Sequence, residues 1–282
     1  MTVIDAHHHL WDPELRDYPW MKGLDALERP FGPAELRDAI RGTPVTQTIV
    51  VQADTSDEET DWLIELAVST PEIVGVVGWA DLTDRGVGDR LAELVDRSRL
   101  VRGIRHLVQD EADPRWLARP DVIAGLGAVR DAGLAYDLLI RRAESPAAVE
   151  AVRAVPDLTF IVDHAAKPGI AAGEWEVWHA DLAALAAHEN VYCKISGLVT
   201  EASHTAWRDD DIVRYIHAVL ELFGPERCMF GSDWPVCLLA APYTDVLGIA
   251  GKATAAVSPH ERDAIYGGTA RAAYGLLREF PS

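Results

Sequence analysis

The chain has 282 residues, of which 49% are hydrophobic and 25% are charged, as in an ordinary soluble globular protein. Its formal net charge of −19 disfavours nucleic acids and anionic membranes as partners, because both are bound through basic patches. No apolar run approaches the ~20 residues that span a bilayer, and no signal peptide is evident.

The first predicted strand, Val3–His9, carries three consecutive histidines in an apolar, β-branched context that does not resemble a purification tag. Side chains alternate between the two faces of a strand. Asp5, His7 and His9 are therefore predicted to share one face, and His8 to point to the other. We interpret the run as an H-x-H pair with His8 in a structural role.

Short apolar runs alternate with amphipathic segments along the rest of the chain. Eight strands are predicted, at Val3–His9, Thr48–Gln52, Val74–Trp79, Val101–His106, Ala135–Ile140, Thr159–Asp163, Val191–Ser196 and Cys228–Gly231. Seven helices are predicted between them, at Ala34–Arg41, Asp57–Ser69, Asp89–Arg97, Asp121–Ala132, Pro146–Val155, Trp175–His188 and Asp211–Phe223.

This alternation favours an α/β fold, a closed (β/α)8 TIM barrel formed by a single domain over residues 1–282. An open doubly wound sheet would need a glycine-rich turn after the first strand, and no dinucleotide or Walker motif occurs. The long segment Leu10–Phe31 is rich in aromatics and prolines, and it is interpreted either as a lid or as a loop packed on the rim.

The chain has three cysteines and no C-x-x-C pair, which disfavours disulfides and a thiolate zinc site. Cys193 and Cys228 lie in apolar runs and are predicted to be buried packing residues. The cysteine content favours a reducing, cytoplasmic location.

Polar residues gather at the carboxyl ends of the predicted strands, where barrel enzymes have their active sites. They are His7, His9, Gln52, Trp79, Asp81, Arg105, His106, Asp137, Asp163, His164, Lys194, Ser196 and Asp233. An unpaired buried polar group costs about 1–3 kcal/mol, so a ring of such groups indicates a site rather than a core. His7, His9, His164 and Asp233 form a candidate zinc set, because imidazole nitrogen and carboxylate oxygen are zinc ligands.

Several motifs give the chain a specific resemblance: DAHHHLW at Asp5–Trp11, GIRH at Gly103–His106, DHAAKP at Asp163–Pro168, KISGL at Lys194–Leu198 and FGSDWPV at Phe230–Val236. The chain resembles the amidohydrolase-2 branch of the amidohydrolase superfamily, and within it the sugar lactonases of the L-fuconolactonase and L-rhamnonolactonase type. The resemblance extends to YGGTARAAYGL, which is similar to that family's last helix.

The resemblance implies a barrel that hydrolyses an aldonic lactone. His7, His9 and His164 match the family's histidines, and Asp233 matches its final-strand aspartate. His8 stands where the family often has glutamine. The resemblance also implies at most one divalent metal ion, with zinc as the candidate, and does not require it for turnover.

Hydrolysis of a lactone needs an activated water and a polarised carbonyl. Asp233 is the candidate general base. Zinc held by the histidines would polarise the carbonyl or the water, and without metal a protonated His7 or His9, together with Lys194, would stabilise the oxyanion. The candidate substrate-binding residues are Arg105, His106, Lys194, Gln52 and Trp234. For these the alternatives are rim ion pairs and, for Trp234, core packing.

Arg105 is the clear arginine among the strand ends, so a neutral sugar lactone is predicted over a carboxylated one. The expected partner is this small molecule alone, and the protein is expected to be a monomer or small homo-oligomer. The alternatives are a metal-dependent decarboxylase of the same branch, a lactonase for carboxylated lactones and a non-catalytic sugar-binding barrel.

Overall fold

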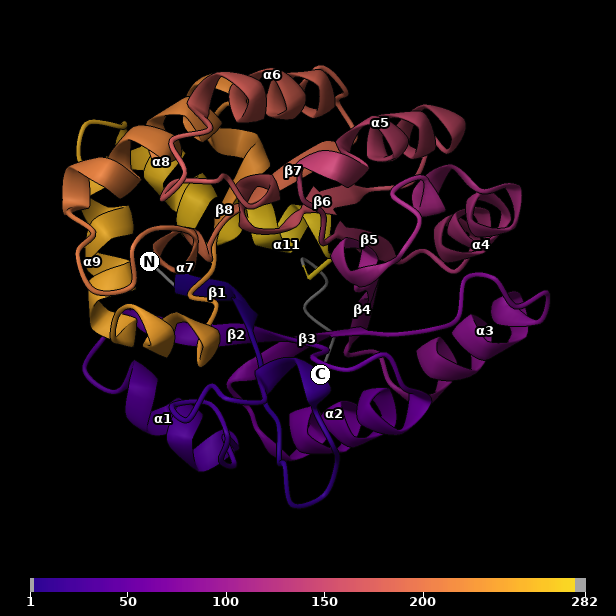
Figure 1. The fold of residues 1–282 in the computed structure, drawn as a ribbon. Helices are drawn as coiled ribbons and strands as arrows, with labels where there is room; N and C mark the ends of the chain where they lie inside the picture. The colour runs from indigo at the N-terminus through magenta and orange to yellow at the C-terminus, as the bar shows by residue number, and fades with distance from the viewer. Residues whose placement is uncertain (1–2, 277–282) are drawn as a thin grey trace.

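The computed structural model describes residues 3–276 and has the predicted (β/α)8 architecture (Figure 1). All neighbouring strands are parallel and follow chain order, and a parallel bridge between His8 and Trp234 joins the first strand to the last. The strands are β1 (Val3–His8), β2 (Val45–Val51), β3 (Ile73–Gly78), β4 (Val101–His106), β5 (Ala135–Leu138), β6 (Phe160–Val162), β7 (Val191–Ile195) and β8 (Cys228–Phe230).

Most of the α-helices surround this barrel, and the seven predicted helices begin and end within two residues of their expected positions. The helices are α1 (Pro33–Ile40), α2 (Asp57–Ser69), α3 (Val87–Arg97), α4 (Pro120–Asp131), α5 (Ser145–Ala154), α6 (Trp175–Ala186), α7 (Leu198–Glu201), α8 (Asp209–Phe223), α9 (Tyr243–Ala253), α10 (Pro259–Asp263) and α11 (Thr269–Ala273). Helices α7, α9 and α10 were not predicted from the sequence. The prediction of one domain over residues 1–282 stays a prediction, and residues 1, 2 and 277–282 lie outside the described range.

The apolar core has two layers. An outer layer lies between the strands and the surrounding helices, and an inner one fills the barrel with side chains such as Ile4, Ile49 and Ile161. Tyr274, just after α11, belongs to this inner layer, and Figure 1 shows α11 in the middle of the ring of strands. The segment around α11 thus packs against the inside of the barrel.

An irregularity in β1 corrects one prediction. Asp5 pairs with Thr48 and His8 pairs with Val50, so β1 has one more residue than β2 between these two pairs. Such a bulge shifts the alternation of side chains. Asp5 therefore does not share a face with His7 and His9; it accepts hydrogen bonds from Ser232 and from Tyr243 of α9.

His8 points away from the barrel mouth, as predicted. Its Nε2 lies 3.0 Å from Oγ1 of Thr48. Burial lowers the pKa of His8 to about 3, so the ring is neutral at physiological pH.

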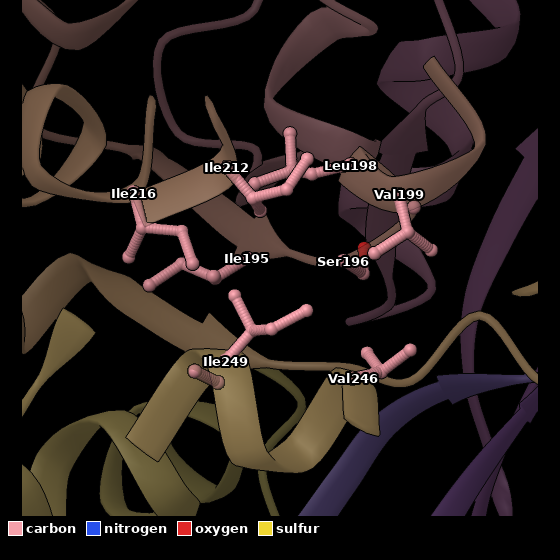
Figure 2. A pocket seen from close by; sticks show the side chains of 10 residues that line it. Ile195, Ser196, Leu198, Val199, Ile212, Ile216, Val246 and Ile249 are labelled. Atoms are coloured by element: carbon pink, nitrogen blue, oxygen red, sulfur yellow. The ribbon is translucent and has the colours of Figure 1, made fainter. Parts of the chain in front are cut away.

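A small apolar cavity of about 20 Å³ lies behind β7, between α8 and α9 (Figure 2). Its lining includes Ile195, Ile212, Ile216 and Ile249, whose side chains face one another in the figure. A water molecule needs two or more polar partners, which such a lining does not offer. We interpret this cavity as a packing gap rather than a ligand site.

Within residues 3–276, no helix combines the length and hydropathy needed to cross a bilayer. Cys193, Cys228 and Cys237 are all free and buried, which confirms the packing role predicted for the first two.

Candidate active site

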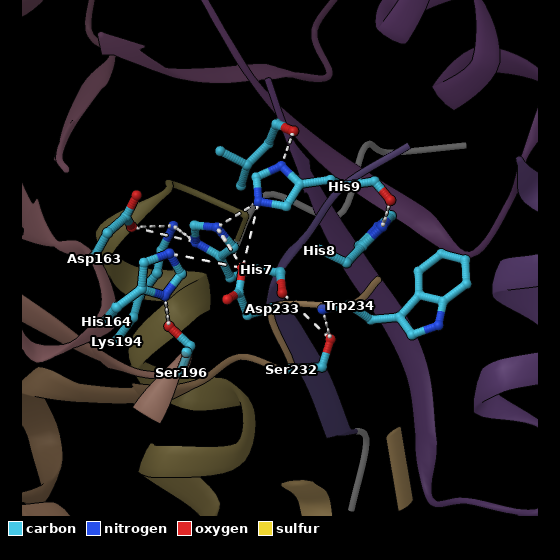
Figure 3. Close-up of polar contacts among 12 residues, drawn as sticks. His7, His8, His9, Asp163, His164, Lys194, Ser196, Ser232, Asp233 and Trp234 are labelled. Atoms are coloured by element: carbon cyan, nitrogen blue, oxygen red, sulfur yellow. Dashed lines mark hydrogen bonds and ion pairs between the residues drawn. The ribbon is translucent and has the colours of Figure 1, made fainter. Parts of the chain in front are cut away.

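Three histidines converge on one carboxylate at the carboxyl ends of the strands (Figure 3). The Nε2 atoms of His7, His9 and His164 lie 3.8, 3.5 and 3.7 Å from Oδ1 of Asp233. The Nε2 atoms of His7 and His9 are 3.1 Å apart. All four residues are buried. His7 and His9 lie in β1 and directly after it, His164 lies in the loop after β6, and Asp233 lies in the loop after β8. The structure thus brings together the four residues predicted as a set.

Polar contacts on the far side of each ring fix the orientation of the histidines. His9 Nδ1 lies 2.8 Å from the Val51 carbonyl, which only accepts, so Nδ1 donates and Nε2 carries the lone pair. His164 Nδ1 lies 2.8 Å from Ser196 Oγ, and His7 Nδ1 lies 3.3 Å from Oδ1 of Asp163. Partners of this kind hold metal-ligating histidines in place.

The charges at this cluster favour neutral rings beside an ionised carboxylate. Burial lowers the pKa of His9 and of His7, and it lowers the pKa of His164 to about 4. Burial opposes ionisation of Asp233, but His164 and His9 hold the pKa of its carboxyl below the usual range. Neutral imidazoles and an ionised carboxylate are the protonation states that a divalent cation requires.

The donor set also fits one metal ion by distance. His7, His164 and Asp233 each offer an atom within 4.8 Å of the others, and His9 Nε2 lies beside two of them. Ligand atoms of a tetrahedral zinc site lie ~3.3 Å apart. Four distances within the cluster, from 3.1 to 3.8 Å, are close to this spacing, although His9 is not part of the group of three whose ligand atoms all lie within 4.8 Å of one another.

A buried ion network lies beneath the cluster. Lys194 Nζ lies 2.5 Å from Asp137, 2.9 Å from Asp163 and 3.0 Å from His7 Nδ1. Tyr274 donates to Asp137 at 2.7 Å. Burial raises the pKa of Asp137 to about 6, whereas Lys194 and His7 overcome burial and hold the pKa of Asp163 well below its usual range. Lys194 and Asp163 contact Nδ1 of His7, so the network holds the His7 ring in position.

Arg105 belongs to the same polar layer. Its guanidinium donates to Asp163 at 3.0 Å and to the side chain of Gln52 at 3.1 Å, and it also contacts the Gln52 carbonyl. Gln52 returns a hydrogen bond to the Arg105 carbonyl. Gln52 therefore orients Arg105.

The loop after β6 has an unusual backbone. His164, Ala165, Ala166 and Lys167 have φ angles of 53°, 51°, 57° and 49°, so four successive residues are left-handed. This conformation costs an L-residue about 1–2 kcal/mol, and such strain is concentrated at functional sites. The turn brings both His164 and Lys167 to the lining of one cavity.

Two glycines allow the close packing around the histidines. A Cβ atom at Gly231 would lie 2.7 Å from the Cβ atom of His7. A Cβ atom at Gly197 would lie 2.6 Å from Nδ1 of His164, and Gly197 also has a φ of +63°. A side chain at Gly231 would therefore displace His7, and one at Gly197 would displace His164.

A cavity of about 430 Å³ adjoins the cluster and includes His9, His164, Asp233 and Arg105 in its lining. Loops after β4 to β7 contribute polar side chains, which are Gln109, Asp110, Arg141, Lys167, Thr200, Glu201 and His204. The segments after β1, β2 and β8 contribute apolar ones, which are Trp20, Leu24, Ala53, Val236 and Leu239. A cavity that is polar on one part and apolar on another suits a sugar-like molecule.

Comparisons with known proteins identify the family of the chain. A family model described as "Amidohydrolase" matches residues 4–276. The chain belongs to this amidohydrolase family. The resemblance recognised from the sequence motifs is thereby confirmed, and the chain is a hydrolase.

Two similar amidohydrolases are L-fucono-1,5-lactonases. The one from Burkholderia multivorans is 39% identical over 286 residues, covering 97% of this chain and 96% of that protein. The one from Burkholderia ambifaria is 40% identical over 246 residues, covering 86% of this chain and 83% of that protein. A crystal structure of an amidohydrolase from B. multivorans with bound zinc is 36% identical, with a TM-score of 0.93 and coverage of 98% and 99%.

Several other predicted site residues of this amidohydrolase lie outside the cavity lining. Lys194 and Gln52 are fully buried below it. His106 stacks on Trp116, with ring centroids 4.2 Å apart, and contacts Glu111 at 2.7 Å. Trp234 packs edge-on against Phe31 in the core.

Other lining residues were not among the sequence-predicted strand ends. Arg141 and Glu201 lie beyond the ends of β5 and β7, where strand periodicity gives no signal. Trp20 and Leu24 of the segment Leu10–Phe31 also line the cavity, while Trp11 in the same segment is buried. This segment is thus partly a packed rim loop and partly a cover of the site.

Proposed function

We propose that this chain is a sugar lactonase that opens an aldonic 1,5-lactone of the L-fucono or L-rhamnono type. The convergence of His7, His9 and His164 on Asp233, at a cavity with polar and apolar parts, carries the proposal. The lactonases that share about 40% of its sequence support the substrate class.

In the proposed mechanism, Asp233 takes a proton from a water molecule as the water oxygen attacks the lactone carbonyl carbon. The carbonyl carbon–ring oxygen bond then breaks, the ring oxygen leaves as a hydroxyl after taking the proton that Asp233 accepted, and the product is a hydroxy acid. Asp233 is suited to the first step because its carboxyl is ionised and faces the cavity. Arg105 has a guanidinium at the cavity that can donate to the carbonyl oxygen or the product carboxylate.

His7, His9, His164 and Asp233 are the residues that would hold a metal ion. When bound, a zinc ion would polarise the carbonyl or lower the pKa of the attacking water. The protein itself orients these residues, through Val51 for His9, Ser196 for His164 and Asp163 for His7.

A lactone panel tests the proposed function. We expect the purified protein to acidify a weakly buffered indicator solution containing L-fucono-1,5-lactone faster than the spontaneous reaction does, because hydrolysis releases a proton. A carboxylated lactone, such as a pyrone dicarboxylate, should have a lower kcat/KM, since binding two carboxylates usually calls for several bidentate arginines and Arg105 is the only strand-end arginine that lines the described cavity. Proton consumption or carbon dioxide release from an aromatic acid, without lactone hydrolysis, would favour a decarboxylase.

Metal content gives a further prediction. We expect elemental analysis of the protein purified with excess zinc to find one tightly bound ion per chain, because one set of converging ligands is present among the described residues. His164→Ala should lose most of this zinc. His106→Ala is the matched control, since its ring lies at another strand end and contacts Glu111. Two tightly bound ions per chain, or equal zinc in both variants, would contradict the mononuclear site.

A further inference from the structure

Three charged side chains of the cavity lie on the loops of three adjacent strands. Arg141 follows β5, Lys167 follows β6, and Glu201 ends the one-turn helix α7 after β7. Glu201 Oε1 is 4.0 Å from Lys167 Nζ, and its Oε2 is 3.4 Å from Arg141 Nη1. The carboxylate thus stands between two cations, and neither contact is a close hydrogen bond.

The backbone holds this Arg141–Glu201–Lys167 set in place. The Glu201 carbonyl accepts from the Ala171 amide at 3.0 Å, which ties the loop after β6 to α7. The Arg141 amide donates to Glu144 at 2.9 Å. Lys167 is held by the left-handed turn after His164. Rigid positioning of loosely paired charges is typical of a binding site that takes its partners from a ligand.

In the described part of the chain, no hydrogen bond or ion pair joins these side chains to the reaction cluster, and Lys167 acts on it only through its charge, which helps to lower the pKa of Asp233. The side chains of Lys167 and Glu201 are only 16% and 14% exposed, and burial lowers the pKa of Lys167. Among residues 3–276, the Lys167 ammonium forms an ion pair only with Glu201, at a distance beyond a hydrogen bond. Keeping a mostly buried ammonium loosely paired is costly unless another group completes its shell.

A hydroxyl group fits between Lys167 and Glu201, and another fits between Glu201 and Arg141. A hydroxyl oxygen can lie ~2.8 Å from each of two atoms that are 4.0 or 3.4 Å apart, accepting from the cation and donating to the carboxylate. One hydroxyl would bridge Lys167 and Glu201, and its neighbour would bridge Glu201 and Arg141. A carboxylate ligand fits less well, because an ionised carboxylate only accepts hydrogen bonds and cannot donate to Glu201.

Building on the proposed function, we infer that Lys167, Glu201 and Arg141 bind two adjacent ring hydroxyls of the lactone and so determine which lactones are accepted. The set lies on the same cavity as Asp233, where the ring must be placed for attack on its carbonyl. These three residues are specificity-determining residues, separate from the cluster that performs the reaction.

The test compares two lactones of the same ring size, L-fucono-1,5-lactone and δ-valerolactone, which has no hydroxyl groups. The measured quantity is the ratio of their kcat/KM values, fucono over valero. In Lys167→Met and Glu201→Gln this ratio should fall by about tenfold or more, because the lost hydrogen bonds involve charged groups that only the hydroxylated substrate contacts.

Arg142→Met is the matched control. Arg142 neighbours Arg141 in sequence, but its guanidinium faces Asp181 at 4.0 Å and does not line the cavity. This variant should keep the wild-type ratio. Thermal melting of each variant would establish that it is folded.

An unchanged ratio in both Lys167→Met and Glu201→Gln would overturn the inference. If kcat/KM falls equally on both lactones, the ratio is unchanged and the residues act in the reaction or in folding. A wild-type protein that opens both lactones without preferring the hydroxylated one would refute hydroxyl recognition but leave the lactonase proposal intact. A wild-type protein that opens neither would contradict the proposed function, and this inference with it.

Discussion

Asp233→Asn is expected to lower kcat by about 100-fold or more on a sugar lactone, with a smaller change in KM. Asparagine keeps the shape of the side chain but removes the basic oxygen that faces His7, His9 and His164. General-base catalysis contributes typically 10²–10⁴-fold, and the interaction is made mainly in the transition state, so the loss should appear in kcat. Steady-state kinetics on L-fucono-1,5-lactone would measure it.

Asp81→Asn is a suitable control for this substitution. Asp81 also lies just beyond a strand end, but its carboxylate accepts from Thr83 and does not line the cavity. Its kcat should stay within a few-fold of the wild-type value. A folded Asp233→Asn protein whose kcat is equally close to wild type would show that Asp233 only braces the histidines.

Lys194→Met is expected to lower the free energy of unfolding by about 3–5 kcal/mol, because it leaves the buried Asp137 carboxylate without its cation and removes one of the two cations that contact Asp163. Asp137 and Asp163 are both fully buried, and each loses a contact of 2.9 Å or less with the ammonium. Urea denaturation at pH 8 would measure the loss. Lys252→Met is the control, since its ion pair with Asp209 is on the surface and should contribute little.

The loss of unfolding free energy in Lys194→Met should also depend on pH. The pKa of Asp137 is already raised to about 6 by burial, and Lys194 is the strongest influence that lowers it. Without Lys194 the folded protein should hold a proton on Asp137 at a higher pH than the unfolded chain does, so folding is favoured as pH falls. The deficit of Lys194→Met relative to wild type should therefore be smaller at pH 5.5 than at pH 8. An unfolding free energy within 1 kcal/mol of wild type at pH 8 would contradict the role assigned to the network.

The sequence predicts the barrel well because its strands and helices follow simple periodic patterns. It also predicts the placement of His7, His9, His164 and Asp233 together, because the carboxyl ends of parallel strands meet at one mouth. Helix α9 was missed because Tyr243–Ala253 contains two glycines and several small residues, which give a weak helical signal.

The features that could not be predicted depend on local backbone geometry or on distant contacts. The bulge in β1 moved Asp5 to the other face, and strict alternation cannot anticipate an extra residue. The left-handed turn at His164–Lys167 contains no glycine, so nothing in the sequence indicates it. Lys194 was interpreted as a candidate substrate contact because its partner Asp137 lies 57 residues away.

The closure of the barrel has a consequence for how the protein is made. Asp5 and Ser232 are 227 positions apart, yet their hydrogen bond and the one from the Asp233 amide to the His7 carbonyl join the two ends of the site. During synthesis on the ribosome, the histidines of β1 emerge long before their carboxylate partner. Tyr274, which contacts Asp137 inside the barrel, emerges later still. The nascent chain must therefore remain protected from aggregation, and without activity, until nearly all of the described sequence has left the ribosome.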